Sequence, residues 1–152
     1  MTTTGATAFP AQKRLLIKRT YPAPIQRVFQ AWIDINDLIR WFTPNPEWPA
    51  RVRDLDVRVG GGFVAEFGAP GESPWVERSQ YREIDPPDHL VLLGHMTRDG
   101  QHVAITRYEI RLVDLDGATE LTLVESGSPP ELLEDRASGW SGTLDNLGRI
   151  LA

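Results

Sequence analysis

The sequence contains no cysteine, so the chain can form no disulfide, no thiolate metal site and no cysteine nucleophile. It has no apolar run close to the roughly 20 residues that a helix needs to cross a bilayer. Met1–Pro10 also lacks the basic and apolar regions of a signal peptide. Basic residues are not clustered, and 16 Lys and Arg against 21 Asp and Glu give a net charge of −5. These absences argue against a nucleic-acid partner and against membrane insertion, and they favour a soluble, cytoplasmic protein.

The length and the composition predict one domain. Hydrophobic residues make up 41% of the 152 residues, which is enough for a core in a domain of that size. Met1–Ala11 is rich in Thr and Ala, and we expect it to be a flexible N-terminal tail. No internal repeat or second domain is visible, so residues 12–152 are expected to form a single domain.

The first part of the chain predicts a strand followed by two helices. Leu15–Tyr21 alternates as a strand does and ends at Pro22. Four apolar residues then recur at the i, i+3, i+4 and i+7 spacing of a helix buried along one face: Ile25, Val28, Phe29 and Trp32. Asp34 is predicted to cap a second short helix. That helix cannot continue through the prolines that follow it, which are Pro44, Pro46 and Pro49.

The middle of the chain predicts short antiparallel strands. From Arg51 onward, turn residues interrupt the apolar segments, and this pattern predicts about six strands. Gly60–Gly62 is expected to bend or bulge one of them, because no helix or Lys-Ser/Thr pair follows to make a phosphate-binding loop.

Two Asp-Gly pairs predict tight hairpins and thereby set strand registers. A turn at Asp116-Gly117 pairs Ile110 with Leu123 and Tyr108 with Glu125. One face of this hairpin is then almost wholly apolar and is expected to face the core.

The other hairpin turns at Asp99-Gly100. If alternate residues keep facing the core through this hairpin as well, without a bulge, His95 pairs with Ala104 and lies on the core face beside Tyr108. His102 then lies on the same face, diagonal to His95. An imidazole in that place could orient a ligand or move a proton near neutral pH.

The end of the chain predicts one long amphipathic helix over Ser128–Ala152, with Ser128 as its cap. An apolar stripe follows from the spacings of four, three and four residues between Trp140, Leu144, Leu147 and Leu151. Small residues beside the stripe are expected to let the sheet or a ligand approach closely: Gly139, Ser141, Gly142 and Gly148. Because helices and strands are segregated, the predicted class is α+β with an antiparallel sheet.

Five motifs occur in one order along the chain. They are Pro22-Ala23-Pro24 with Val28-Phe29 and Ala31-Trp32, Arg40-Trp41-Phe42, Asp56–Phe63, Tyr81–Val91, and Gly139-Trp140 with Leu144-Asp145 and Leu147. Each is weak alone, but together they resemble the SRPBCC (START-like) superfamily, and within it the domain named for the activator of the heat-shock protein 90 ATPase. The resemblance extends from Leu15 to Leu151.

The resemblance implies a helix-grip fold, in which a curved antiparallel sheet wraps around the long C-terminal helix and leaves a cavity between them. Members of the superfamily bind lipids, polyketides or other apolar molecules in that cavity, and some catalyse cyclisation or hydrolysis there. The family name points to the stress response and to a chaperone partner. In eukaryotic proteins, however, a separate N-terminal domain makes much of that contact, and a chain of 152 residues is not expected to contain it.

On this basis we predict a set of ligand-binding residues, which are Trp41, Phe63, Phe67, His95, Tyr108, Trp140, Leu144 and Leu147. The alternative stays open that the aromatic residues only fill a core and that His95 is a buried histidine with one polar partner. Two histidines without a third ligand do not make a metal site, so we predict no metal. The sequence also shows no catalytic set and no cofactor motif.

Three functions remain, in this order. The first is binding of a small apolar ligand between the sheet and the last helix. The second is a cyclase or hydrolase that uses the same cavity, with His95 or a nearby Glu as its acid or base. The third is a chaperone-interacting module, which would need an exposed apolar patch. A homodimer is compatible with all three.

Overall fold

The computed structural model describes residues 14–152, and the tail predicted for residues 1–11 lies outside them. The elements are β1 Leu15–Tyr21, α2 Ile25–Gln30, α3 Ile35–Trp41, β2 Arg51–Arg53, β3 Gly62–Phe67, β4 Trp75–Asp85, β5 His89–Arg98, β6 Gln101–Asp114, β7 Thr119–Ser126, the 3₁₀ turn η1 Pro130–Leu132, and α4 Leu133–Leu151. The seven strands form one antiparallel sheet in the order β1-β7-β6-β5-β4-β3-β2.

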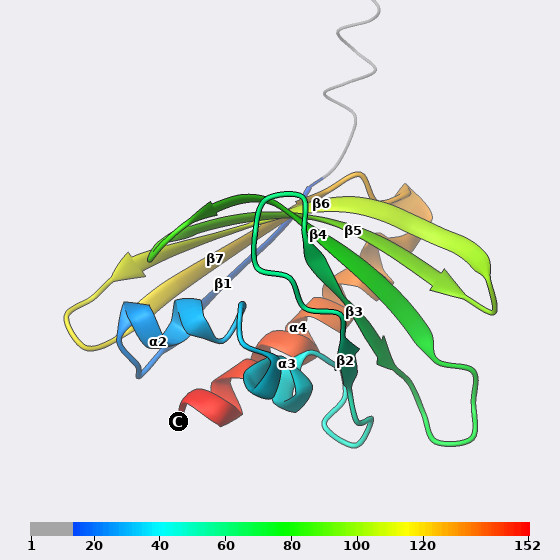
Figure 1. Cartoon of the computed structure of the whole chain (residues 1–152), viewed down its shortest axis with the longest axis horizontal. Coiled ribbons are helices and arrows are strands. Elements are labelled where there is room, and N and C mark those ends of the chain that lie inside the picture. The colour runs from blue at the N-terminus through cyan, green and yellow to red at the C-terminus, as the bar shows by residue number, and fades with distance from the viewer. Residues whose placement is uncertain (1–13) are drawn as a thin grey trace, which may run out of the picture.

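The sheet arches over α3 and α4, as Figure 1 shows, and α4 runs along its concave side. This is the predicted α+β helix-grip fold. Within residues 14–152, no helix is both long and apolar enough to cross a membrane.

The two short helices begin where the sequence predicted, but α2 ends at Gln30, so Trp32 of the predicted stripe lies in the turn after it. Pro24 precedes α2, and the Asp34 carboxylate caps α3 by accepting hydrogen bonds from the backbone N–H groups of Asn36 and Asp37 at 2.9 and 3.2 Å. Arg27 donates two hydrogen bonds to the Asp37 carboxylate, at 2.7 and 3.0 Å, and so fastens α2 to α3.

The hairpin between β6 and β7 has the predicted register. Ile110 pairs with Leu123, and Tyr108 pairs with Glu125. Asp116 and Gly117 both have positive φ, at 62° and 99°, as a tight primed turn requires. All four paired side chains are buried, so the face predicted to be apolar does face the core.

The hairpin between β5 and β6 differs from the prediction by one residue. Its turn lies at Asp99-Gly100, as expected, and Thr97 pairs with His102. After that pair the strand β6 contains a bulge, in which Val103 is an extra residue without a partner on β5. The next pair is therefore Met96 with Ala104. Every later residue of β6 is therefore displaced by one position along β5.

The last helix begins later than predicted. Ser128 does not cap it: the Ser128 hydroxyl lies 3.4 Å from the Pro129 carbonyl oxygen, and α4 starts at Leu133 after the turn η1. Pro129 has an extended backbone, with ψ at 142°. The cause is local, since Pro130 disfavours helical ψ in the residue before it.

The small residues of α4 serve different neighbours. A Cβ at Gly142 would collide with the carbonyl oxygen of Pro44, so this glycine lets the loop after α3 approach the helix. A Cβ at Gly148 would lie 3.3 Å from the ring of Tyr21, so this one lets α4 approach β1. Gly139 has open space around its Cβ position.

Buried aromatic rings fill the space between α2, α3 and the middle of α4. The ring centroids of Trp32 and Trp41 are 4.6 Å apart, and those of Phe42 and Trp140 are 6.0 Å apart, both with edge-to-face geometry. The Tyr21 hydroxyl donates a hydrogen bond to the Leu144 carbonyl at 2.8 Å, which ties β1 to the helix. The core is therefore closed on this side.

Candidate functional site

A pocket of about 450 Å³ lies between the sheet and the first half of α4. We call it the α4 pocket. Three segments line it. The sheet contributes Phe67, Trp75, Glu77, Met96 and Val103; the segment at the start of α4 contributes Leu132, Asp135, Arg136, Ser138, Gly139, Trp140 and Thr143; and the loop after α3 contributes Phe42, Pro44, Asn45 and Trp48.

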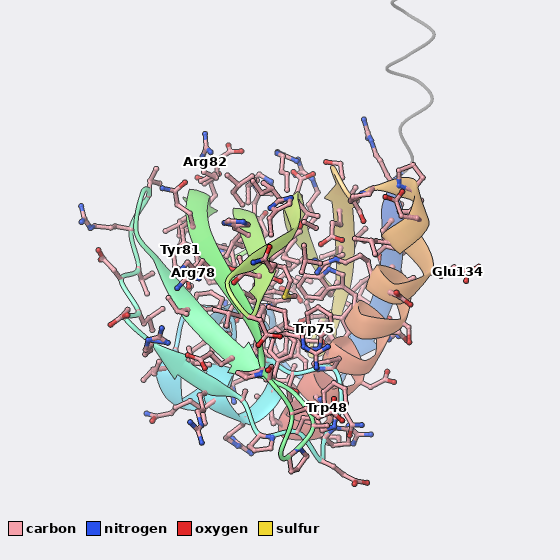
Figure 2. The ribbon with its side chains drawn as sticks, turned by 90° about the vertical axis from the view of Figure 1, so that its right-hand side faces the viewer. Trp48, Trp75, Arg78, Tyr81, Arg82 and Glu134 are labelled. Carbon is pink, nitrogen blue, oxygen red and sulfur yellow. The ribbon has the colours of Figure 1, made fainter. Side chains whose placement is uncertain are left out.

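The walls of the α4 pocket are mainly aromatic and aliphatic. Figure 2 looks onto this side of the molecule and shows Trp75 of β4 and Trp48 of the loop near α4, whereas Glu134 of α4 points away from the sheet. Gly139 adds no side chain on the helix side, and its Cβ position faces open space. The aromatic core begins with Phe42 and Trp140, which line the pocket and also pack against each other.

One buried carboxyl group lies in this apolar wall. Glu77 on β4 is 3% exposed, and its Oε2 is fully buried without a hydrogen-bond partner among the described residues. The carboxyl group lies over Gly94 of β5, where a Cβ would be 2.5 Å from Glu77 Oε2. Only glycine at position 94 leaves room for the carboxyl group in this position.

A second buried carboxylate, Glu125 of β7, holds Arg136 of α4. Arg136 donates hydrogen bonds from Nε to Glu125 Oε1 at 3.0 Å and from Nη2 to Glu125 Oε2 at 2.6 Å. Trp140 Nε1 and Thr106 Oγ1 donate to Glu125 Oε2 at 2.8 and 3.1 Å. Both oxygens of Glu125 are thus satisfied, and the guanidinium is oriented by this pair.

The same arginine makes a weaker contact with the Glu77 carboxyl group. Arg136 Nη1 lies 3.8 Å from Glu77 Oε1, which is an ion-pair distance but too long for a hydrogen bond. Burial, above all, raises the pKa of Glu77 from 4.5 to about 7; the charge of Glu125 adds to this rise and that of Arg136 opposes it. The Glu77 carboxyl group therefore changes its charge near neutral pH.

Tyr108 of β6 lies behind these groups. Its hydroxyl and that of Ser79 are 2.7 Å apart, and either can be the donor. Burial raises the pKa of Tyr108 well above its ordinary value, and the charge of Glu77 raises it further. Tyr108 is therefore a neutral neighbour, and Glu77 is the group in the pocket wall that can gain or lose a proton near pH 7.

The comparison with protein families decides where this chain belongs. The model described as "Activator of Hsp90 ATPase homolog 1-like protein" matches residues 22–152. The chain belongs to this family. The comparison with curated proteins found no match.

Solved structures agree with the family. Protein CV1439 from Chromobacterium violaceum is 25% identical, with a TM-score of 0.80 over 91% of this chain and 96% of that chain. Mll3558 from Rhizobium loti is 27% identical, with a TM-score of 0.75 over 91% of this chain and 96% of that one. A protein from Arthrobacter aurescens, 22% identical over 91% and 85% of the chains, has a TM-score of 0.81 and shows a likeness of fold alone.

The structure separates the predicted ligand-binding residues of this Hsp90-activator-like fold into three groups: residues that line the pocket, residues of the core, and His95. Phe67 and Trp140 line the α4 pocket. The others on the concave side are fully buried members of the core and are not among the lining residues: Trp41, Phe63, Tyr108, Leu144 and Leu147.

His95 lies on the opposite face from the one we predicted. Its neighbour Met96 lines the pocket, and successive strand residues point to opposite faces, so His95 points to the convex side. It pairs with Ile105 rather than Ala104 because of the bulge at Val103. His95 Nε2 lies 3.1 Å from His102 Nδ1, so the two histidines do share a face, but it is the exposed one.

His95 and His102 could offer two ring nitrogens to a metal ion, but no third ligand among the described residues lies with them. A different trio lies where β4 ends and β5 begins: Glu83, Asp85 and His89 have ligand atoms within 4.8 Å of one another. His89 Nε2 already lies 2.6 Å from Glu109 Oε2. Exposed acidic groups of this kind are common on protein surfaces, and the trio has no other feature of a metal site.

Sequence reasoning missed Glu77 and Arg136, although the sequence carries a signal for each. Trp75, Glu77 and Ser79 alternate on the inward face of β4, so Glu77 is a charged residue at a core position. Arg136 lies four residues before Trp140 and therefore extends the stripe of α4 by one helical turn.

Proposed function

We propose that this protein binds a small, mainly apolar molecule in the α4 pocket. The observation that carries the proposal is the pocket itself, with a volume of about 450 Å³ within the range of about 300 to 1,000 Å³ that is typical of small-molecule sites. Aromatic and aliphatic walls around a few polar groups are also the usual composition of such sites. Membership of the Hsp90-activator-like family, whose fold often binds ligands, supports it.

Native mass spectrometry of the freshly purified protein tests this proposal directly. A reproducible extra mass that is lost on denaturation is expected, and its size gives the mass of the ligand. The second measurement is the thermal shift of the protein with phenylbutanol, a neutral apolar probe, which should raise the melting temperature because it binds only the folded state.

A pair of variants locates the binding. Gly139→Leu places a side chain in the open space on the helix side of the pocket, and it should abolish the thermal shift by phenylbutanol. His95→Ala changes a residue on the convex face and should leave the shift unchanged. A shift that persists in Gly139→Leu, or the absence of both the extra mass and any shift in the unmodified protein, would refute the proposal.

A second function, acid–base catalysis on a bound apolar substrate, is favoured by one specific observation. Glu77 is a buried carboxyl group in the pocket wall with a pKa raised to about 7, and a general acid or base works best when its pKa is near the ambient pH. We predicted His95 or a nearby Glu for this role, and we now propose Glu77 for it. Once the ligand mass is known, conversion of that compound by the protein, lost in Glu77→Gln, would establish an enzyme.

A further inference from the structure

The charges around the α4 pocket do not balance. Glu77 and Glu125 are both buried carboxyl groups, and Arg136, whose side chain is 13% exposed, is the one cation beside them in the described part of the chain. Glu125 takes both hydrogen bonds of the guanidinium fork, at 2.6 and 3.0 Å. When Glu77 is ionised, the trio carries a net charge of −1, and one of the Glu77 oxygens accepts no hydrogen bond from any described residue.

Three kinds of polar group on a ligand could meet this imbalance, and they are not equivalent. An anion would meet two carboxylates and an arginine that is already paired, so it is disfavoured. A neutral hydroxyl could donate a hydrogen bond to Glu77 but would leave the charge uncompensated. A protonated amine does both, because it donates hydrogen bonds and supplies the missing positive charge.

The rest of the pocket also suits a cation. Asp135, an exposed residue of α4, lines the pocket and adds a further negative charge. The aromatic walls have electron-rich faces that attract cations.

From these contacts the geometry points to a ligand class: the α4 pocket takes an apolar amine, with its ammonium group against Glu77 and its hydrocarbon or aromatic body between the sheet and α4. This inference rests on the proposed function, because it names the ligand class of the same pocket. It assigns Glu77 as the residue that determines specificity for a cation over an alcohol or an acid of the same size.

Three probes of one shape separate the alternatives. Phenylbutylamine, phenylbutanol and phenylbutyrate share a body and differ in the terminal group, and titration calorimetry gives the dissociation constant of each. The amine is expected to bind about tenfold or more tightly than the alcohol, as hydrogen bonds to charged groups exceed those to neutral ones. The acid is expected to bind most weakly of the three.

The substitution Glu77→Gln keeps the shape of the side chain and removes its charge. It should weaken binding of the amine about tenfold or more, while binding of the alcohol changes little. The matched control is Glu134→Gln, the same change on the outer side of α4, which should leave the affinity for all three probes unaltered.

The pH dependence gives a readout that needs no variant. A proton competes with the ammonium group for Glu77, whose charged neighbours are Arg136 of α4 and Glu125 of β7, with neutral Tyr108 of β6 behind. Affinity for the amine should therefore rise about tenfold from about pH 6 to about pH 8, while affinity for the alcohol stays level.

The outcomes separate the two proposals. If the alcohol or the acid binds the unmodified protein as tightly as the amine, the inference about amines is wrong and the proposed function stands. The same holds if the amine binds equally well to Glu77→Gln or shows no dependence on pH. If none of the three probes binds and no ligand mass is found, both proposals are overturned.

Discussion

Replacing Glu77 by Gln should make the folded protein more stable at neutral and alkaline pH. Burial raises the pKa of Glu77 in the folded state to about 7, whereas the unfolded chain keeps the ordinary value of 4.5. Between these two values the folded state holds a proton that the unfolded state has lost, so the free energy of unfolding falls as the pH rises. Below pH 4.5 the carboxyl group is neutral in both states, and this loss is absent.

The size of the effect follows from the two pKa values. Their difference, about 7 minus 4.5, at about 1.4 kcal/mol for each pH unit, gives about 3 kcal/mol once the pH is above 7. Glu77 is only 3% exposed, so solvent screening does not reduce this figure much. For a domain of this length, about 3 kcal/mol corresponds to roughly 6 to 12 °C in melting temperature.

Urea unfolding of the parent protein and of Glu77→Gln, followed by tryptophan fluorescence from about pH 4 to about pH 8.5, measures this difference. The difference between the two curves matters, because all other titrating groups are shared. It should be smallest at the acid end and should grow in favour of the variant up to neutral pH. Glu134→Gln, on the outer side of α4, should show no such trend. A difference that is constant with pH would refute the assignment of the raised pKa to Glu77.

Two further predictions concern α4. Arg136→Met should destabilise the protein by about 3 to 5 kcal/mol in urea unfolding at neutral pH, because it leaves the Glu125 carboxylate buried without its cation; a loss below about 1 kcal/mol would show that Glu125 can be satisfied by its neutral donors. Gly142→Ala should destabilise by about 1 to 3 kcal/mol, since the new Cβ meets the carbonyl oxygen of Pro44. Gly139→Ala, in the same helix with open space at its Cβ, should instead stabilise by about 1 kcal/mol. Equal effects at the two glycines would contradict the close approach of the loop.

The two hairpins show when a strand register can be predicted from sequence. In the hairpin at Asp116-Gly117, the turn residues and the apolar face of both strands favour one register, and that register is the one observed. The hairpin at Asp99-Gly100 has the same turn but a weak alternation after it. Its bulge at Val103 leaves Ile105 48% exposed, and the register without a bulge would have put His95 in the core. The register with the bulge leaves an apolar residue exposed, and the register without it buries a polar one. The pattern of apolar residues therefore could not decide between the two registers.

The candidate site was predictable in its parts and not in its assembly. Glu125 was predicted on the core face, and the stripe of α4 extends to Arg136. Their contact, however, depends on the position of α4 along the sheet, and packing between residues distant in sequence sets that position. Tyr21 against Gly148 and the loop against Gly142 fix that position. Local pattern shows which face a residue occupies, whereas such long-range contacts decide which residues on that face meet.

Glu77 connects the stability of the empty protein with the proposed ligand. An apolar residue at this position would avoid the loss of about 3 kcal/mol above pH 7, so the carboxyl group is costly unless a bound group compensates its charge. If a protonated amine is that group, binding and ionisation are linked and each must favour the other. Saturating phenylbutylamine should then raise the stability of the parent protein more at about pH 8 than at about pH 6, and so flatten its decline with pH. In Glu77→Gln the amine should leave the shape of the curve unchanged. Equal stabilisation of the parent protein at both pH values would mean that the amine, even if it binds, has a partner other than Glu77.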